Sequence, residues 1–337
     1  MIANVFSLTL SITMNPVIGI NADSGAIDGN LSVLASMLEQ FQEAGFAHVE
    51  IPAHGVDGII HGTVDLRQLE ALSRLLRKYS FSYSVHAPDL LSPADTLCPE
   101  IHIAALQASI DIASEIGARI VVCHGSSRCD RPAHESSTHS SHQPRTASSP
   151  VTNADIDTYA YIADYASHRG VIVALENIFR QHPRERSFRI DPKDLSALVS
   201  AVSSPHLGIC FDFGHAFISA AEEGFDFIQS FEAVLPHLVH VHIHDNFGKP
   251  SLQLHRHIDM LFQGAGDLHL PPGWGAIPYD AMFPMLMARY RGVFMMEIHP
   301  RFKAHYKEAI AWMVRMAPES IDSGENLNRH NAMHSGG

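Results

Sequence analysis

The stretch GICFDFGH (208–215) is a run of apolar residues that ends at an acid and a histidine. The same pattern, an apolar run that stops at a His, Asp or Glu, recurs in YSVHAPD (83–89), RIVVCHGS (119–126), VIVALEN (171–177), LVHVHIHDN (238–246) and GVFMMEIHP (292–300). A further segment, DLHLPPGWGAI (267–277), adds an Asp and a His before the last run. Apolar strands that each end in metal-ligating side chains are typical of a barrel with a site at its mouth.

Helical patterns separate these runs, so that strands and helices alternate along the chain. We expect strands near 5–12, 47–51, 82–86, 119–124, 171–176, 207–212, 238–244 and 293–298. We expect helices near 31–45, 65–79, 100–117, 154–169, 192–203, 222–236, 278–290 and 304–316. These units predict the α/β class and a single (β/α)8 TIM barrel over residues 1–316. An open, doubly wound sheet is disfavoured because no glycine-rich phosphate turn follows the first strand.

Three segments fall outside this alternation. Residues 126–153 are rich in Ser, His and Pro, and residues 249–266 separate two of the motifs. We expect both to form insertions at the barrel mouth, since loops after the strands build that face. The polar residues 317–337 predict a frayed C-terminal tail.

Composition argues against several classes of protein. The formal net charge is −13 and the chain has no long run of Lys or Arg, which argues against non-specific nucleic-acid binding. No apolar run is long enough to span a membrane, and the four cysteines form no CxxC pair, so we expect a reduced, cytoplasmic protein without a membrane partner. The apolar N-terminus lacks a basic region and is interpreted as a first strand rather than a signal peptide. Whether the chain forms a homo-oligomer is left open.

Histidine is the unusual residue in this composition. The 24 His residues outnumber the 23 Lys and Arg residues combined, and His is the commonest metal ligand. In the run HVHIH (240–244) the period of a strand puts three histidines on one face. At about 3.3 Å per residue, His240 is expected to lie deeper in the barrel than His242. We therefore predict His242 as a metal ligand, His240 as a hydrogen-bonded core residue and His244 as a substrate contact at the rim.

Acidic residues end three other predicted strands. Glu176 ends VIVALE, Asp212 ends GICFD and Glu297 ends VFMME. A carboxylate at the end of an apolar strand is costly to bury unless it is paired, protonated or bound to metal. With His242 these residues would supply oxygen and nitrogen ligands to one divalent ion, and this ligand set suits Mn, Zn, Fe or Co, with Mg as a further option.

Further residues of ligand type follow the predicted strands. These are His86, His124, His215, Asp267 and His269, which suffice for a second and a third ion or act as hydrogen-bonding contacts to a substrate. The basic cluster after the fifth strand, Arg180, Arg184, Arg186 and Arg189, is a candidate phosphate or carboxylate site, with a solvated loop as the alternative. Asn177 and Arg180 are further candidates for substrate binding.

Taken together, these motifs resemble those of a known superfamily. Residues 1–316 resemble the xylose isomerase-like barrels, which include sugar phosphate isomerases and epimerases and the endonuclease IV type of apurinic endonuclease. The motifs that carry this resemblance are HAPDLLSPA (86–94), VVCHGSS (121–127), ALEN (174–177), FDFGHA (211–216), HIHDNFG (242–248) and HLPPGWGAI (269–277). The segments 126–153 and 249–266 are longer than in typical members.

The resemblance implies specific ligands. The ligands shared by the isomerases fall on Glu176, Asp212, His242 and Glu297. The three-metal pattern of the endonuclease branch adds His86, His124, His215, Asp267 and His269, and all nine positions are filled. The chain would thus bind one to three divalent ions. The motifs HIHDN and HLPPGWG resemble those of the isomerase and epimerase group more than those of the endonuclease branch.

Two enzyme classes follow from this. In the first, a metal-dependent isomerase or epimerase, Glu176 and Glu297 exchange a proton with a small sugar or sugar phosphate through a metal-stabilised ene-diolate. In the second, a multinuclear hydrolase, two or three ions activate water against a phosphoester. The acidic net charge makes DNA a poor candidate substrate for the second class. The filled ligand set argues against a barrel that only binds.

Overall fold

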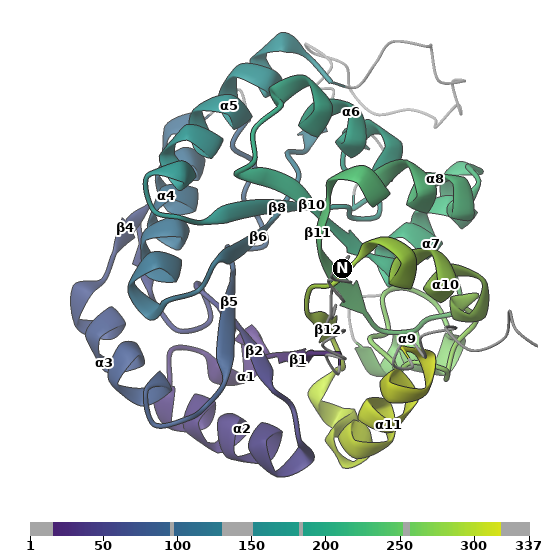
Figure 1. The fold of residues 1–337 in the computed structure, drawn as a ribbon, viewed down its shortest axis with the longest axis horizontal. Helices are drawn as coiled ribbons and strands as arrows, with labels where there is room; N and C mark the ends of the chain where they lie inside the picture. Colours follow the sequence, from purple (N-terminus) through teal and green to yellow (C-terminus); the bar gives the residue numbers. More distant parts are fainter. Residues whose placement is uncertain (1–15, 95–97, 130–150, 182–184, 252–256, 318–337) are drawn as a thin grey trace, which may run out of the picture.

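The computed structural model describes residues 16–94, 98–129, 151–181, 185–251 and 257–317. Eight parallel strands close into a barrel in the order β1-β12-β11-β10-β8-β6-β5-β2, and helices surround it as a ring (Figure 1). The strands are β1 (Ile18–Asn21), β2 (His48–Pro52), β5 (Ser82–His86), β6 (Ile120–His124), β8 (Ile172–Glu176), β10 (Leu207–Asp212), β11 (Leu238–Ile243) and β12 (Phe294–Met296). The (β/α)8 TIM barrel predicted from the sequence is therefore confirmed.

The main helices lie where apolar residues recur at helical spacing. They are α2 (Leu31–Ala44), α3 (Leu66–Leu76), α4 (Pro99–Ile116), α5 (Asn153–Ser167), α6 (Pro192–Val202), α7 (Phe213–Glu223), α8 (Phe227–Val234), α10 (Tyr279–Arg289) and α11 (Tyr306–Met316). Short helices α1 (Ser24–Ile27) and α9 (His257–Gln263) lie in loops. Two small two-stranded antiparallel sheets pair β3 (Ile59–Ile60) with β4 (Thr63–Val64) and β7 (Arg128–Cys129) with β9 (Glu185–Arg186). Side-chain caps fix several helix starts, such as Asp65, which accepts hydrogen bonds from the backbone of α3.

The first strand differs from the prediction. Residues 5–12 lie outside the described residues, and the place between β12 and β2 is filled by β1, with Ile18 opposite Phe294 and Gly19 opposite His48. The four-residue sequence IGIN is a weak strand by propensity. Backbone pairing on both sides compensates for this weakness, which a single-sequence pattern does not reveal.

The region after β10 also differs from the prediction. We expected one helix over 222–236, whereas two helices, α7 and α8, occupy this region. The carboxylate of Asp212 accepts a hydrogen bond from the backbone N–H of His215 and so starts α7 directly at the strand end. A Cβ on Gly214 would lie 2.0 Å from Cε1 of His244, so glycine is required here for close packing.

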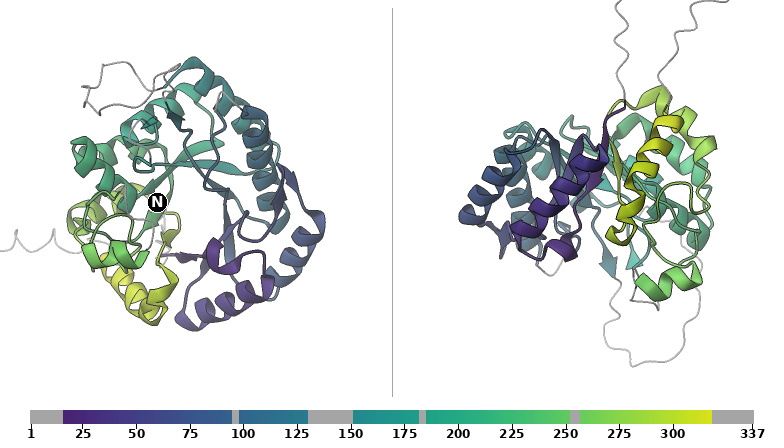
Figure 2. Two further views of the ribbon diagram at one scale, coloured as in Figure 1. Left: turned by 180° about the vertical axis from the view of Figure 1, so that it is seen from behind. Right: turned by 90° about the horizontal axis from the view of Figure 1, so that it is seen from below.

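An early helix and the last helix of the barrel pack together through aromatic side chains. The purple helix α2 and the yellow helix α11 lie side by side in both views of Figure 2. The ring centroids of Phe41 on α2 and Tyr306 on α11 are 5.9 Å apart, and Phe46 packs against the same tyrosine at 5.6 Å. Within the described ranges, none of the helices combines the length and the apolar character that a bilayer crossing would need.

Candidate metal centre

Four residues from four strands converge at the carboxyl end of the barrel. Glu176 ends β8, Asp212 ends β10, His242 lies in β11 and Glu297 follows β12, and their ligand atoms all lie within 4.8 Å of one another. Nδ1 of His242 is 3.3 Å from Oε1 of Glu176 and 3.3 Å from Oε1 of Glu297. This four-residue group is the one that the sequence predicted as the principal metal site. It is called the central group below.

A second group shares Glu176 with the first. Nε2 of His86, at the end of β5, is 3.2 Å from Oε2 of Glu176, and Nε2 of His124, at the end of β6, is 3.5 Å from the same oxygen. The two oxygens of Glu176 therefore face different groups. Oε1 contacts His242 of the central group, and Oε2 contacts His86 and His124.

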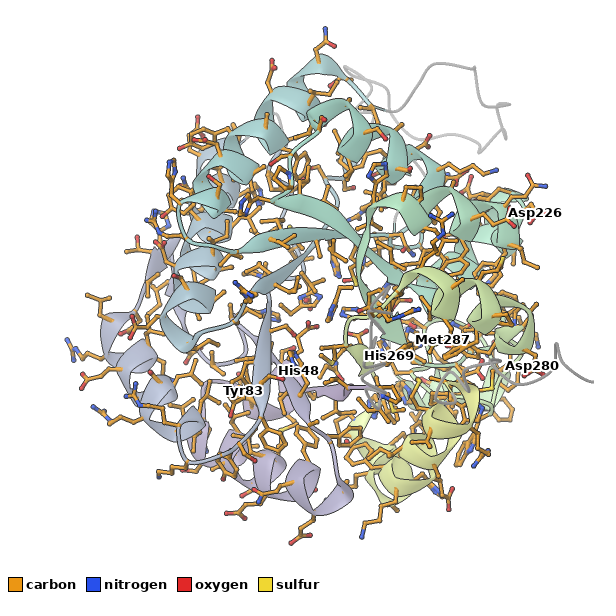
Figure 3. All side chains as sticks on the ribbon, in the orientation of Figure 1. His48, Tyr83, Asp226, His269, Asp280 and Met287 are labelled. Carbon is orange, nitrogen blue, oxygen red and sulfur yellow. The ribbon has the colours of Figure 1, made fainter. Side chains whose placement is uncertain are left out.

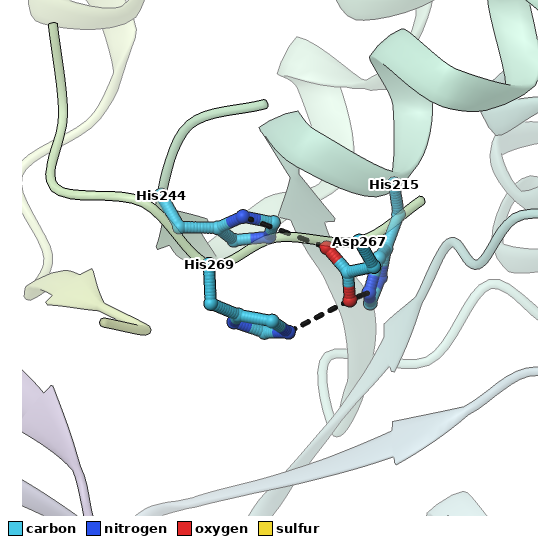
Figure 4. A group of neighbouring side chains, drawn as sticks. All are labelled: His215, His244, Asp267 and His269. Atoms are coloured by element: carbon cyan, nitrogen blue, oxygen red, sulfur yellow. Dashed lines mark hydrogen bonds and ion pairs between the residues drawn. The ribbon is translucent and has the colours of Figure 1, made fainter. Parts of the chain in front are cut away.

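The third group has four residues, His215, His244, Asp267 and His269 (Figure 4). Oδ2 of Asp267 is 3.1 Å from Nε2 of His215 and 2.7 Å from Nε2 of His269. Oδ1 of the same carboxylate is 3.6 Å from Nδ1 of His244. His269 adopts a φ of 44°, a backbone conformation that costs free energy for a residue with a side chain and recurs at functional sites.

Backbone carbonyls orient four of these histidines in the same way. Nδ1 of His86 lies 2.7 Å from the carbonyl oxygen of Ala87, that of His124 lies 2.8 Å from Asp89 O, that of His269 lies 2.9 Å from Glu297 O and that of His215 lies 3.1 Å from Asn177 O. A carbonyl can only accept a proton, so Nδ1 is the donor in each ring. The lone pair of Nε2 is thereby available towards the neighbouring carboxylates, which is the arrangement found in metal-ligating histidines.

Burial and charge shift the acid-base properties of these groups strongly. Burial disfavours the charged form of Glu176, but the positive charges of His242 and His124 outweigh it and hold the pKa of this carboxyl well below its usual range. Burial raises the pKa of Glu297. Burial opposes charging of His86 and His269 as well, yet Glu176 and Asp267 respectively raise their pKa to about 10. In the absence of a cation, protons on these rings therefore balance the carboxylates.

The donor set fits a divalent cation. Among the described residues, Oε1 of Glu176, Nδ1 of His242, Nδ1 of His244 and Oδ1 of Asp267 are buried and have no hydrogen-bond partner. Buried polar atoms normally have partners, so their clustering is the feature that a bound cation would explain. The carboxylate oxygens and the imidazole nitrogen of the central group suit Mn, Zn, Fe or Co. The Sγ atom of Cys210 also lies within 4.8 Å of a ligand atom of Glu176 and of His242.

A cavity of about 290 Å³ lies at this mouth. It is lined by residues of all three groups, including Glu176, Asp267 and Glu297. The remaining wall combines polar residues, such as Asp23, Asp89 and Gln181, with apolar ones, such as Ile178, Phe179 and Ile298. A polar cavity of this size suits a small hydrophilic substrate.

Helix α9 lies beside this cavity. The ring of His257 on α9 stacks on that of His299 at 3.9 Å between centroids, and His257 Nε2 is 2.8 Å from the carbonyl oxygen of Leu268. The described part of the segment 249–266 thus contacts a residue of the cavity wall and the backbone next to Asp267.

Two residues that were expected to contact a substrate lie in the interior of the protein. His244 does not lie at the rim but is fully buried, because Leu270 pairs with Asp245 just after β11 and the ring of His269 stacks on that of His244 at 4.2 Å. Asn177 is also fully buried, and its amide joins β8 to β10 through the backbone N–H and carbonyl of Asp212. Neither residue is among those that line the cavity.

The side chain of Arg180 also binds other residues of the protein. Its guanidinium pairs with the carboxylate of Glu223 and donates to the backbone carbonyl of Glu185. Arg189 pairs with the buried carboxylate of Glu185 and donates to the carbonyl of Gly125, so it braces the loop after β6. Both arginines are therefore paired with carboxylates of the protein itself. Arg184 lies outside the described residues.

Sequence reasoning missed Glu50. This residue lies in β2, is 1% exposed and has its Oε1 3.0 Å from Nε2 of His242. The signal was available in the strand HVEIP (48–52), where His48 and Glu50 alternate with apolar residues as the histidines of HVHIH do. It was overlooked because Glu50 lies inside its strand rather than at the end.

Comparisons with known proteins agree with the barrel fold. A family model described as a xylose isomerase-like TIM barrel matches residues 38–316. An uncharacterized protein of Methanocaldococcus jannaschii is 26% identical over 219 residues, which are 64% of this chain and 67% of that protein.

Solved structures with the same fold include several epimerases. A D-tagatose 3-epimerase-like protein has a TM-score of 0.63 at 22% identity, over 90% of this chain and 98% of its own. The IOLI protein with a bound zinc atom has a TM-score of 0.62 at 18% identity, over 90% of this chain and 98% of its own. At such identities these likenesses establish the fold alone.

Proposed function

The chain belongs to the xylose isomerase-like TIM barrel family, and we propose that it is a metal-dependent isomerase or epimerase of a small sugar or sugar phosphate. The observation that carries this proposal is the central group. Within it, the Glu176 and Glu297 carboxylates reach the same cavity from different strands and each lies 3.3 Å from Nδ1 of His242. Two carboxylates beside one cation site are what proton exchange at a carbon next to a carbonyl requires.

The central group would hold the cation through Glu176, Asp212, His242 and Glu297. When bound, a divalent cation at this position polarises a carbonyl and lowers the pKa of the adjacent C–H. Asp212 is fixed by two histidine contacts and by its cap on α7, so it serves as an anchor rather than as a base.

The proton steps fall to the two glutamates. One carboxylate removes the proton from the carbon next to the carbonyl and becomes a carboxylic acid, leaving a planar ene-diolate. If the other carboxyl group then donates a proton to the opposite face, the configuration at that carbon inverts. If a proton returns to the neighbouring carbon instead, the product is an aldose–ketose isomer.

The test is deuterium incorporation. The protein loaded with Mn²⁺ is incubated in D2O with free ketohexoses, pentuloses and their phosphates, and the substrate is examined by NMR for exchange at the carbon next to the carbonyl. Exchange and epimer formation are expected for at least one substrate, and both should be lost in Glu176→Gln and Glu297→Gln. Retention of full exchange in both variants would contradict the assignment.

A second candidate, a multinuclear phosphoester hydrolase, is favoured by a different observation. The three groups together contain all nine ligand positions, and Glu176 joins two of them through its separate oxygens. Two or more ions close together clamp a phosphoester and activate water. Metal analysis decides between the candidates together with hydrolysis of bis(p-nitrophenyl) phosphate. Three ions per chain with phosphodiesterase activity would favour hydrolysis, and one ion with deuterium exchange would favour isomerisation.

A further inference from the structure

A buried carboxylate that belongs to none of the three groups lies directly after β11. Asp245 follows His244 in the chain and is 1% exposed. Its Oδ1 accepts hydrogen bonds from the backbone N–H of Asn246 at 2.9 Å and of Ile277 at 3.3 Å, and its Oδ2 accepts one from the backbone N–H of Gly273 at 2.9 Å. Asp245 therefore joins the end of a barrel strand to a loop that comes later in the chain.

The backbone of Asp245 binds the same loop. Its N–H donates to the carbonyl oxygen of Leu270 at 2.9 Å, and its carbonyl oxygen accepts from the N–H of Leu270 at 3.0 Å. The carboxylate and this backbone pair together hold residues 270–277 against the end of β11. A buried carboxylate is costly unless it is paired, so displacement of the loop would deprive Asp245 of the donors that Gly273 and Ile277 supply.

The loop packs closely on Asp245 at Gly275. A Cβ on this glycine would lie 2.3 Å from Oδ1 of Asp245 and 2.3 Å from the carbonyl oxygen of Asn246. The next residue, Ala276, donates its backbone N–H to that same carbonyl oxygen at 2.8 Å. Only glycine permits this approach, which gives a structural reason for the second glycine of the motif HLPPGWGAI (269–277).

The third group is assembled from two parts of the chain that this loop brings together. His215 on α7 and His244 after β11 belong to the barrel, whereas Asp267 and His269 lie in the segment that leads into the loop. Nε2 of His215 is 3.1 Å from Oδ2 of Asp267, and the ring of His269 stacks on that of His244 at 4.2 Å. Among the described residues, Nδ1 of His244 and Oδ1 of Asp267 are buried without a hydrogen-bond partner, which a shared cation would explain.

We propose that Asp245 is a positioning residue, which holds Asp267 and His269 at the third group by fixing the loop that follows them. The inference rests on the proposed metal-dependent function and extends it from the central group to the third group. The residues of a binding site must be held to within about 0.5 Å of the geometry that the ligand requires. Loss of the anchor at Asp245 would therefore weaken a cation at the third group, whereas the central group, whose residues lie in or directly after strands, would keep its geometry.

Two other contacts would still hold the segment if Asp245 were changed. Nε2 of His257 donates to the carbonyl oxygen of Leu268 at 2.8 Å, and the backbone N–H of His299 donates to that of His269 at 3.0 Å. A substitution at Asp245 should therefore displace His269 and its neighbours rather than release them. The expected loss is that of an outer partner of a ligand, about 10- to 100-fold in metal affinity, and not the loss of the whole site.

The test is titration calorimetry of metal-free protein with Zn²⁺. His215→Ala identifies which binding sites belong to the third group, and Glu297→Gln identifies those of the central group. In Asp245→Asn, an amide that cannot accept from a backbone N–H replaces one side-chain oxygen, so the Zn²⁺ affinity of the third-group sites should fall about 10- to 100-fold. Asp245→Ala should lose at least as much, and both variants should keep the affinity of the central group.

Gly275→Ala tests the same contact from the side of the loop. It keeps the carboxylate but pushes the loop away from Oδ1 of Asp245, so it should weaken the same Zn²⁺ sites, and it tests the inference even if the Asp245 variants do not fold. Asp226→Asn is the control. Oδ1 of Asp226 accepts the backbone N–H of Gln229 at the start of α8, at the periphery of the molecule and far from His269 (Figure 3). This variant should change the affinity of neither class of site.

A purely structural role for Asp245 predicts a different outcome. The folded variants would then unfold at a lower urea concentration in the presence of a chelator but bind Zn²⁺ at the third group with wild-type affinity, and this result would overturn the inference. An equal loss of affinity at both classes of site would also overturn it.

Failure of the inference and failure of the proposed function give different results. If no ion of the wild type is sensitive to His215→Ala, the third group holds no cation, which refutes the inference and leaves the proposed function standing. If every ion survives Glu297→Gln, the proposed function is contradicted, and the Asp245 variants still decide the inference. A protein that binds no Zn²⁺ refutes both.

Discussion

Asp212 has two separable roles, and two substitutions distinguish them. Its carboxylate belongs to the central group and also accepts a hydrogen bond from the backbone N–H of His215 at the start of α7. Asn is as good a helix cap as Asp, whereas Ala costs about 1 kcal/mol. Asp212→Asn and Asp212→Ala both remove the anionic ligand, but only the second removes the cap. The backbone of Asp212 stays tied to Asn177 in both variants.

The two variants should therefore differ in stability and agree in metal binding. Without metal, Asp212→Ala should unfold with a free energy about 1 kcal/mol below that of Asp212→Asn, measured by urea titration in the presence of a chelator. In both, Mn²⁺ affinity should fall by more than the roughly 100-fold that marks the loss of an outer partner of a ligand. Titration calorimetry measures this loss.

Asp65 provides the control pair. Its carboxylate caps α3 through the backbone N–H groups of Arg67 and Gln68. Asp65→Asn and Asp65→Ala should show the same stability difference with no change in Mn²⁺ affinity. Wild-type affinity in Asp212→Asn would refute the ligand assignment, and equal stability of the two Asp212 variants would refute the capping argument.

Three further predictions concern packing, protons and the second insertion. Gly214→Ala should disrupt the third group, because a Cβ there would lie 2.0 Å from the ring of His244, and metal analysis should show fewer ions than in the wild type. Zn²⁺ binding at pH 7 should release protons, since neighbouring carboxylates raise the pKa of His86 and His269 to about 10 despite burial, and equal calorimetric enthalpies in buffers of different ionisation heat would contradict this. Shortening 249–266 should raise KM or abolish turnover, because α9 contacts the cavity wall, and unchanged kinetics would exclude a lid.

The residues at the strand ends could be predicted because the end of an apolar strand and the candidate site lie at the same place in a barrel. In β6, β8 and β10 the residues before the mouth are apolar, so the first His, Glu or Asp marks both the strand end and the candidate site. Glu176, Asp212 and His124 each occupy the last position of the observed strand. The sequence therefore revealed which residues meet without any three-dimensional information.

Other features depend on partners that the local sequence does not contain. β1 is defined by pairing with β2 and β12, and not by its own four residues. His244 is buried by a segment that returns from more than twenty residues further along the chain. Glu50 is recognisable only once β11 is placed across the barrel from β2, since both His240 and His242 point at it. Each of these is a long-range contact, which periodicity cannot report.

The pairing of β1 with β12 has a consequence for how the protein is made. β1 is synthesised before β12, and the barrel cannot close until Ile18 in β1 pairs with Phe294 in β12. Glu297 is synthesised after His86, His124 and Glu176. These three side chains are therefore present in the nascent chain before the central group is complete. Such long-range closure makes folding slow, since the entropy of the intervening chain is lost before the pairing stabilises it. At the proposed metal site, the choice of cation would therefore be made by the closed barrel and not by the growing chain.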